Sequence, residues 1–463
     1  MQKYHSETQA LVQLALPVFI TQFSQVAVNY ADSVMAAEVS VTDLSAVGTA
    51  SLIWLPIILL GQGVLQALTP IIGQLNGANQ QHLIKHHVWQ GFWLALLISL
   101  PLIGLLCCTS WFLPFIPNMS TELAELTQRY LSVMIYGVPS YLLYLVLRCL
   151  CEGLSKPIPP MGIGLIGLVI NIIANYIFIH GKFGAPALGS VGCAVATVII
   201  YWLLFLFLLG YMVKKGQQQT WQLLPYWEAP NLVALSKLLC LGLPIGFSYF
   251  FEVTLFTVAP LFMIVPLGKQ WIAGHQVAMA FSSVVFTLPF SIAIASSIRV
   301  SHCLGEQLPQ KAKTAAYAGL VLGLCIAIAT AILTMVFRDS IAAFRISDPT
   351  VITIAGQLLL FSAVYQCFDA LQVVANGILR GYKDTLAAFV MTLISYWILG
   401  LSSCYILGLT DYWVPKMGAN GIWCGFIIGI TSAAILLLLR LVWIQRITLL
   451  SSKKTVGLTR EST

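Results

Sequence analysis

The chain has 463 residues, of which 59% are hydrophobic and 8% are charged, and its mean hydropathy is +0.89. So much apolar surface excludes an ordinary soluble fold and indicates a protein that crosses a membrane several times. The formal net charge of +7 does not indicate a nucleic-acid partner, because the basic residues stand singly between apolar segments, as topology signals do.

Charged and turn-forming clusters divide the chain into twelve apolar segments, each long enough for the roughly 20 helical residues that span a bilayer. Several are longer than that, so we expect helices that tilt or extend into the aqueous phase. The sequence therefore predicts an all-α polytopic membrane protein with twelve transmembrane helices. The segments run approximately over 10–37, 44–74, 86–115, 127–152, 157–181, 187–213, 236–268, 271–303, 312–337, 350–380, 384–409 and 418–446.

Lys and Arg residues are distributed unevenly between alternate loops. One set of loops, with both ends of the chain, holds 17 of the 23, and the opposite set holds six. Cytoplasmic loops carry the excess of positive charge, so both termini are predicted to be cytoplasmic. Arg148 with Glu152, and Arg380 with Asp384, stand at cytoplasmic helix ends, where topology anchoring and ion pairing account for them.

The second half of the chain repeats short passages of the first. LALP, which ends at Pro17, recurs as LGLP, which ends at Pro244, 227 residues further on. QLNGA around Gly77 is echoed by HCLGE around Gly305, 228 residues further on. Each pair falls at the same point in the helix order of its half, so the chain is predicted to consist of two six-helix repeats.

We expect these repeats to form two lobes joined by a polar linker. An even number of helices in each gives both the same topology, related by a pseudo-two-fold axis along the membrane normal, with substrates bound between them. The predicted division is an N-terminal lobe at 1–213, a cytoplasmic linker at 214–236, and a C-terminal lobe with a short cytoplasmic tail at 237–463.

An acidic residue, Asp32, lies inside the first apolar segment. A carboxylate at that depth costs roughly 2.5–3.5 kcal/mol on insertion scales, and such residues are by default candidates for a functional site. Gln22, Gln25, Asn29 and Asp32 are spaced at intervals of three and four, which places them on one face of a helix. The alternative is a set of interhelical hydrogen bonds that stabilise the bundle.

The fifth and sixth segments offer neutral partners for Asp32. Asn171 and Asn175 are four residues apart and share a helix face, and Thr197 lies in the next segment. Their amides and hydroxyl could hydrogen-bond the carboxylate, although packing roles explain these residues almost equally well.

The second half contains two more isolated acids, Glu252 and Asp369, with Tyr365 one helical turn before Asp369. Oxygen ligands suit a hard monovalent cation, and an aromatic ring attracts cations to its face. The sequence therefore predicts a cation site, with Na+ bound at Glu252 and Asp369 beside Tyr365. The alternative is a buried salt bridge, but the nearest basic residues, Arg380 and Lys237, are expected at the cytoplasmic boundary.

Motifs for other chemistry are absent from the sequence. There is no GxxxxGK[ST] phosphate loop, so no nucleoside triphosphate drives the protein from this chain. No GxSxG, HExxH or comparable grouping indicates an enzyme. The eleven cysteines are scattered without metal-ligand spacing, and His82, His86 and His87 are expected in a solvated loop. We therefore expect no cofactor other than a coupling ion, Na+ or H+.

The chain closely resembles NorM-type multidrug and toxic compound extrusion (MATE) transporters from its first helix to its last. The passages that carry the resemblance are LALP at 14–17, ADSVMA at 31–36, QLNGA at 74–78, GKFGAP at 181–186, FFEVTLF at 250–256, YQCFDA at 365–370 and LRGYKD at 379–384. The resemblance implies two six-helix lobes that export organic cations and drugs in exchange for Na+ or H+. It also implies that Asp32, with Asn171, Asn175 and Thr197, couples protonation to substrate, and that Glu252, Asp369 and Tyr365 bind the cation.

These observations predict a secondary antiporter that works as a monomer in the bacterial inner membrane, without nucleic-acid or nucleotide partners. The main alternative is a lipid-linked oligosaccharide flippase of the same architecture, which would require a strongly basic cavity. An ion channel would need a filter sequence, and an intramembrane enzyme would need a nucleophile with a base, for which His275 is the only candidate.

Overall fold

The computed structural model describes residues 2–113, 119–216, 227–344, 348–411 and 415–461. All regular secondary structure in these residues is helical, which confirms the predicted all-α fold. Eleven helical segments are long and apolar enough to cross a membrane. A twelfth span results if α6 (Thr121–Met134) and α7 (Gly137–Gly153), which meet at a bend of 46°, count as one. The twelve predicted segments are thus confirmed.

Contacts divide the chain into two compact units, which we call the amino-terminal unit (residues 20–250) and the carboxy-terminal unit (residues 1–19 with 251–463). The helices α1 (Gln2–Ala37) and α10 (Leu232–Met263) each contribute residues to both units. In both helices the division falls shortly after the proline of the sequence repeat. The division predicted from the sequence repeats, with lobes at 1–213 and 237–463 and a linker at 214–236, stays a prediction; residues 217–226 of that linker lie outside the described residues.

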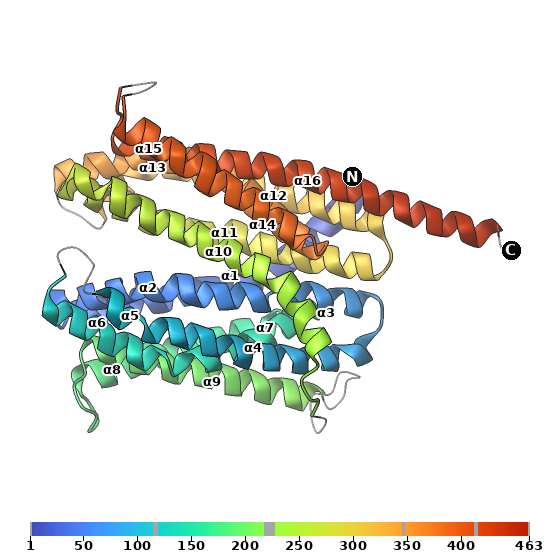
Figure 1. Ribbon diagram of the computed structural model, residues 1–463, viewed down its shortest axis with the longest axis horizontal. Helices are drawn as coiled ribbons and strands as arrows, with labels where there is room; N and C mark the ends of the chain where they lie inside the picture. The colour runs from blue at the N-terminus through green and yellow to red at the C-terminus, as the bar shows by residue number, and fades with distance from the viewer. Residues whose placement is uncertain (1, 114–118, 217–226, 345–347, 412–414, 462–463) are drawn as a thin grey trace. The chain divides into compact units, whose positions relative to one another are not determined.

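Within each unit the helices run side by side as a bundle (Figure 1). Besides its parts of α1 and α10, the amino-terminal unit contains α2 (Val41–Leu65), α3 (Leu68–Gly77), η1 (Gln81–Leu83), α4 (Ile84–Cys107), α5 (Thr109–Phe112), α6, α7, α8 (Ile158–His180) and α9 (Ser190–Gly216). The carboxy-terminal unit adds η3 (Val265–Leu267), α11 (Lys269–Gly305), α12 (Pro309–Ala343), α13 (Pro349–Gly381), α14 (Thr385–Leu393), the π-helical η4 (Ile394–Gly400), α15 (Leu401–Leu409) and α16 (Ala419–Glu461).

Local sequence accounts for several helix ends. Ser40 caps α2, because its hydroxyl accepts a hydrogen bond from the backbone N–H of Asp43 at 2.9 Å. Asp348 caps α13 in the same way and is followed by Pro349, a residue favoured in the first turn. The helix α8 ends where Gly181 adopts a left-handed conformation with φ of +66°.

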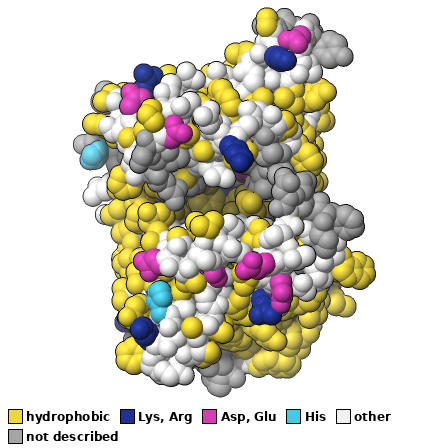
Figure 2. All heavy atoms as spheres, turned by 90° about the vertical axis from the view of Figure 1, so that its left-hand side faces the viewer, with side chains coloured by type: hydrophobic (Ala, Val, Ile, Leu, Met, Phe, Trp, Pro, Cys, Tyr) yellow, Lys and Arg dark blue, Asp and Glu magenta, His cyan; other side chains and the backbone are white. Residues whose placement is uncertain are grey.

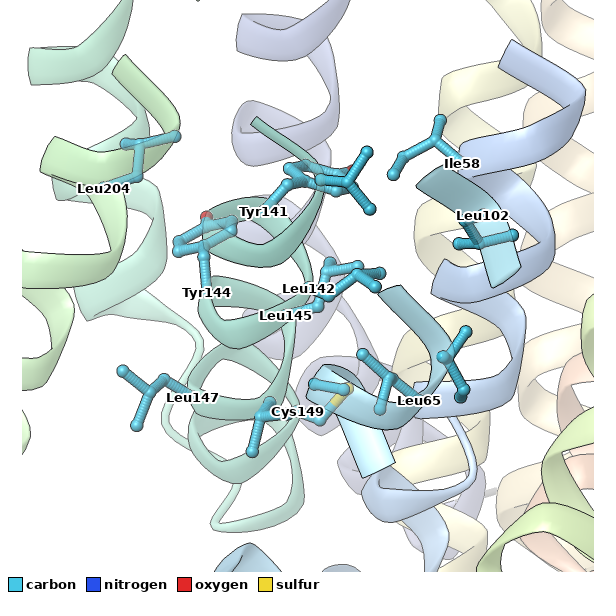
Figure 3. Close-up of a cluster of buried hydrophobic side chains, with 14 of the residues drawn as sticks. Ile58, Leu65, Leu102, Tyr141, Leu142, Tyr144, Leu145, Leu147, Cys149 and Leu204 are labelled. Atoms are coloured by element: carbon cyan, nitrogen blue, oxygen red, sulfur yellow. The ribbon is translucent and has the colours of Figure 1, made fainter. Parts of the chain in front are cut away.

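The core of the amino-terminal unit surrounds α7, whose side chains are buried along its whole length. Tyr141, Leu142 and Leu145 of this helix pack in a cluster with Ile58 and Leu102 (Figure 3). The helix that carries Arg148 therefore lies inside the core of its unit.

Glycines allow helices to approach closely in both units. A Cβ added at Gly63 would collide with the backbone of Gly246, so α2 and α10 pack backbone to backbone within the amino-terminal unit. In the carboxy-terminal unit, a Cβ at Gly377 would collide with the carbonyl oxygen of Ala293, so α13 lies directly against α11.

Apolar side chains cover much of the outer surface. Figure 2 looks onto the ends of the helices, where the few charged side chains are of both signs, and hydrophobic side chains dominate the flanks. Leu100, Val336, Phe337 and Leu439 are among the large apolar residues that are more than half exposed. Such a surface matches a protein whose flanks face lipid.

Candidate functional site

In the amino-terminal unit, two helices bring neutral polar groups to the carboxylate of Asp32. Asp32 lies on α1 and is only 4% exposed. The Nδ2 of Asn175, on α8, donates to its Oδ1 at 2.6 Å, and the hydroxyl of Thr197, on α9, donates to its Oδ2 at 3.2 Å. Both carboxylate oxygens therefore have a partner, and neither partner is charged.

Asn171 completes this cluster one turn before Asn175. The Nδ2 of Asn175 also donates to the Oδ1 of Asn171, at 3.1 Å, and both asparagines are fully buried. Asn171 also acts on the Asp32 carboxylate through a side-chain hydrogen bond. Within the described chain, the Oδ1 of Asn175 has no hydrogen-bond partner, so the cluster keeps a buried acceptor available for a water molecule or a polar ligand.

The structure adds residues to this cluster that the sequence did not indicate. The thiol of Cys193 donates to the backbone oxygen of Asp32 at 3.7 Å. Tyr130, on α6, and Tyr201, on α9, are close enough for the charge of Asp32 to act on them. No sequence signal separates these residues from the other tyrosines and cysteines in apolar segments, since only helix packing brings them to Asp32.

The polar residues that precede Asp32 on α1 do not share one environment. Gln22 is buried and Gln25 is half-buried, whereas Asn29 is exposed. The hydroxyl of Tyr141 forms a side-chain hydrogen bond with Gln25 and also donates to Oε1 of Gln62 at 2.9 Å. The predicted polar face of α1 is therefore only partly turned toward the other helices of its unit.

Arg148 and Glu152 form the ion pair predicted for them near the end of α7, and this pair is buried. They are 3% and 2% exposed, and Nε of Arg148 donates to Oε1 of Glu152 at 2.8 Å. Nη2 of Arg148 donates to Oε1 of Gln22 at 3.0 Å, and Thr69 donates to the second carboxylate oxygen of Glu152 at 3.3 Å. The pair thus links α7 to α1 and to α3, a connection that sequence spacing could not show.

In the carboxy-terminal unit, the structure brings Glu252, Asp369 and Tyr365 together. Asp369 and Tyr365, on α13, are 3% and 9% exposed and form a side-chain hydrogen bond, in which the hydroxyl of Tyr365 donates. The charges of Asp369 and Glu252, the latter on α10, act on each other. Two carboxylates and a phenol from two helices thus form one acidic centre, in which Asp369 and Tyr365 are buried and Glu252 is half-buried.

Two further groups belong to the surroundings of this centre. Arg380 lies in the last turn of α13, the helix end at which it was expected; it is buried, and its charge acts on Glu252. Tyr396, on η4, lies within electrostatic reach of both Glu252 and Asp369. Phe256 packs edge to face on the ring of Tyr365 at 6.1 Å, so apolar groups limit access to the acids.

No group of three or more His, Cys, Asp or Glu side chains within the described residues has the geometry to hold a metal ion. The acidic centre offers two carboxylates and phenol oxygens, a donor set that fits a hard monovalent cation rather than a transition metal. Elsewhere, His86 forms an ion pair with Glu228 at 2.6 Å, and His275 is buried against the ring of Trp423 at 5.7 Å.

Comparisons with solved structures show the same fold in other proteins. The crystal structure of the eukaryotic MATE transporter AtDTX14 matches with a TM-score of 0.87 and 21% identity, over 97% of this chain and 100% of that one. An outward-facing multidrug resistance MATE family transporter of the MOP superfamily matches with a TM-score of 0.85 and 20% identity, over 97% of both chains. At these identities the likeness concerns the fold alone.

Sequence comparisons identify the family. The chain is 48% identical over 446 residues to the multidrug resistance protein MdtK of Yersinia pestis (strain Pestoides F), which is 96% of this chain and 97% of that protein. It is similar to MdtK of Photorhabdus laumondii to the same extent. The MatE family model matches twice, over residues 17–177 and 244–406. The two matches begin 227 residues apart, which is the offset of the repeat seen in the sequence. The chain therefore belongs to the MatE family of multidrug and toxic compound extrusion transporters, and it is a multi-pass membrane protein.

Proposed function

We propose that this multidrug efflux transporter exports drugs and other organic cations in exchange for Na+ or H+ by alternating access. The observation that carries the proposal is that each compact unit contains an acidic centre built on a buried carboxylate: Asp32 with neutral donors in one, and Asp369 with the half-buried Glu252 in the other. Ionisable groups inside membrane helices are expensive and mark ion or proton pathways. The names of the MdtK relatives support multidrug resistance as the role.

The centre at Glu252 and Asp369 is proposed to bind the coupling ion, with Na+ favoured over H+. Two close carboxylates disfavour each other's ionised form, so one can hold a proton while the other helps to bind Na+. Tyr365 donates to Asp369 and presents a ring face that attracts a cation. A bound Na+ would thus replace the missing positive charge, with Tyr365 holding the Asp369 carboxylate in place.

Asp32 is proposed to couple its protonation to the substrate. Its carboxylate attracts an organic cation when it is ionised and loses that attraction when it is protonated. Asn175 and Thr197 bond to its oxygens directly, and Asn171 orients Asn175. All three partners are neutral, so none supplies a permanent positive charge that would keep Asp32 ionised.

The coupling requires no further cofactor in this proposal. One charge that crosses a potential of 100 mV supplies about 2.3 kcal/mol. An ion that binds one conformation more tightly than the other shifts their populations, and the drug is released in the state that the ion favours. We propose that the protein does this as a monomer in the bacterial inner membrane, with both termini in the cytoplasm.

Counterflow in proteoliposomes tests this proposal. A Na+ gradient is imposed at fixed pH with a protonophore present, and drug movement is followed. We expect Na+ to drive drug transport in the wild type, and Glu252→Gln and Asp369→Asn to abolish the Na+ response. Asp348→Asn is the matched control, because Asp348 is an exposed helix cap in the same unit and Asn caps equally well.

The alternatives give other results in this assay. Transport that ignores Na+ and follows an imposed proton gradient would show that the acidic centre is a proton relay. Movement of a lipid-linked sugar without drug transport would favour the flippase. The pairing of the buried Arg148 with Glu152 leaves little net positive charge there for the anionic cargo of such a flippase.

A further inference from the structure

Tyr396 is a buried tyrosine in an irregular part of a membrane helix. It is 1% exposed and lies in η4, where the segment Ile394–Gly400 is π-helical between the α-helices α14 and α15. The backbone N–H of Leu401 bonds to the carbonyl of Tyr396, five residues earlier. Single π-helical turns inside α-helices are rare and occur frequently at functional sites.

Tyr396 lies in the same buried cluster as Tyr365 and within electrostatic reach of the acidic centre of the carboxy-terminal unit. The charges of Glu252 and Asp369 act on it, and so does Tyr365. Glu252 lies on α10 and the other two residues on α13, so η4 supplies the third element around the centre. Glu252, Asp369 and Tyr365 were candidate site residues from the sequence, whereas Tyr396 was not.

The next residue ties η4 to the backbone beside Glu252. The indole N–H of Trp397 donates to the carbonyl oxygen of Phe251 at 3.2 Å, and the two rings meet edge to face at 5.6 Å. Because Phe251 directly precedes Glu252, the π-helical turn and the carboxylate are held in a common register. The contacts of Trp397 with Phe251 therefore hold the neighbouring Tyr396 at a fixed position along α10.

The hydroxyl of Tyr396 has no hydrogen-bond partner within the described chain, although it is buried. Leaving a buried hydroxyl unpaired is unfavourable, so each such group calls for an explanation. Tyr365 is different, because its hydroxyl donates to Asp369. The oxygen of Tyr396 thus has lone pairs that no described residue occupies, within electrostatic reach of two carboxylates.

We propose that the hydroxyl oxygen of Tyr396 is a third side-chain ligand of the monovalent cation, beside Glu252 and Asp369. This inference rests on the proposed cation site and adds a ligand from η4 to it. A neutral oxygen adds a contact for a dehydrated metal cation without adding charge. Removing the Tyr396 hydroxyl should therefore weaken Na+ binding, but it should have little effect on the stability of the protein in the absence of Na+.

Thermal unfolding of the purified protein in detergent tests this inference. Na+ is varied against choline at constant ionic strength, and the rise in melting temperature gives the Na+ concentration at half effect. We expect Tyr396→Phe, which keeps the ring, to raise that concentration about tenfold, equivalent to roughly 1.4 kcal/mol. Without Na+, its melting temperature should equal or exceed that of the wild type, since an unpaired buried hydroxyl is removed.

Tyr144→Phe is the matched control, because Tyr144 is also 1% exposed but lies on α7 in the other unit. It should leave the Na+ concentration at half effect unchanged. If Tyr396→Phe responds to Na+ as the wild type does while Asp369→Asn does not respond, the inference is wrong and the cation site stands. If Asp369→Asn also responds normally, the proposed cation site itself is wrong. A lower melting temperature of Tyr396→Phe without Na+, at an unchanged Na+ response, would show a purely structural role.

Discussion

The Asp32 carboxylate shows at the scale of a single residue how a buried acid can remain ready to titrate. Two neutral donors hold its oxygens, and no Lys or Arg side chain within the described chain forms an ion pair with it. A Lys or Arg partner in a permanent salt bridge would keep the Asp32 carboxylate ionised and would compete with protons and organic cations for it. The neutral surroundings therefore support a coupling role better than a structural one.

We predict that Asp32→Asn abolishes most drug export while expression persists. The amide keeps the size of the carboxylate but loses the charge; its oxygen can still accept from the Nδ2 of Asn175, and its NH2 group takes the place of the oxygen that accepts from Thr197. Losing a charged hydrogen bond costs roughly 1.5–3 kcal/mol, which corresponds to about ten- to a hundredfold in rate or affinity. The loss is measured by comparing the efflux of several substrates from cells that express the wild type or Asp32→Asn.

The control for this substitution is Asp348→Asn, at an exposed helix cap. Normal export by Asp32→Asn across all substrates would show that the polar cluster only stabilises the bundle.

Residue types in the sequence indicated the members of both acidic centres, and the structure brings these members together. Asn171 and Asn175 share a face of α8 at a spacing of four, as predicted, but only tertiary packing places that face against Asp32. Tyr396 escaped notice because one more tyrosine in an apolar segment carries no periodic signal. Its function in cation binding, like the roles of the other site residues, is a proposal.

At the scale of elements, the ion pair on α7 determines how α1 is held. Arg148 contacts Gln22, ten residues before Asp32 on the same helix, and Pro17 lies one further turn away, inside α1. A proline weakens the helix at that point, so the hydrogen bond from Arg148 fixes the part of α1 that follows the proline. Through Gln22, α7 positions the helix segment that carries Asp32.

We predict that Arg148→Gln destabilises the protein by roughly 3–5 kcal/mol, because Glu152 would remain buried without its partner. Arg129→Gln is the matched control. Arg129 also pairs with a glutamate four residues away, Glu125, but both side chains are more than 60% exposed, and such pairs contribute at most about 1 kcal/mol. Equilibrium unfolding in detergent compares the two variants.

Gln22→Leu separates the positioning role from stability, because it leaves the ion pair intact. We expect it to shift the pH dependence of drug export with a smaller loss of stability than Arg148→Gln. An unchanged pH profile would mean that Arg148 stabilises the bundle without positioning Asp32.

The sequence predicted where the membrane-spanning helices lie, but it did not predict where they break, bend or become π-helical. The segment predicted at 44–74 is divided into α2 and α3, and the segment at 127–152 is bent by 46° between α6 and α7. The segment at 384–409 contains the π-helical η4. Hydropathy reports only that a stretch can cross the bilayer, whereas a bend or a wider turn depends on the helices packed against it.

At the scale of the whole molecule, the charge of the loops predicts the orientation in the membrane. Cysteines introduced at Glu122 and Ser340, in a background without the eleven native cysteines, should react with an impermeant reagent in intact cells. Both residues are exposed at the ends of α6 and α12 that belong to the loops poor in Lys and Arg.

Lys215→Cys, in a loop rich in Lys and Arg, is the control for this labelling and should react only after the cells are opened. Protection of both Glu122→Cys and Ser340→Cys in intact cells would contradict the topology.

The sequence by itself determined the all-α class, the number of spans, the internal repeat and the family, because these depend on composition, hydropathy and short motifs that each segment carries alone. It also indicated which acids are isolated in apolar segments. Only the tertiary structure decided that Arg148 and Glu152 are buried together, that α1 and α10 each contribute to two compact units, and that Tyr396 joins Glu252 and Asp369. These features arise from contacts between residues that are far apart in the chain, and the pattern of one segment holds no information about its neighbours in space.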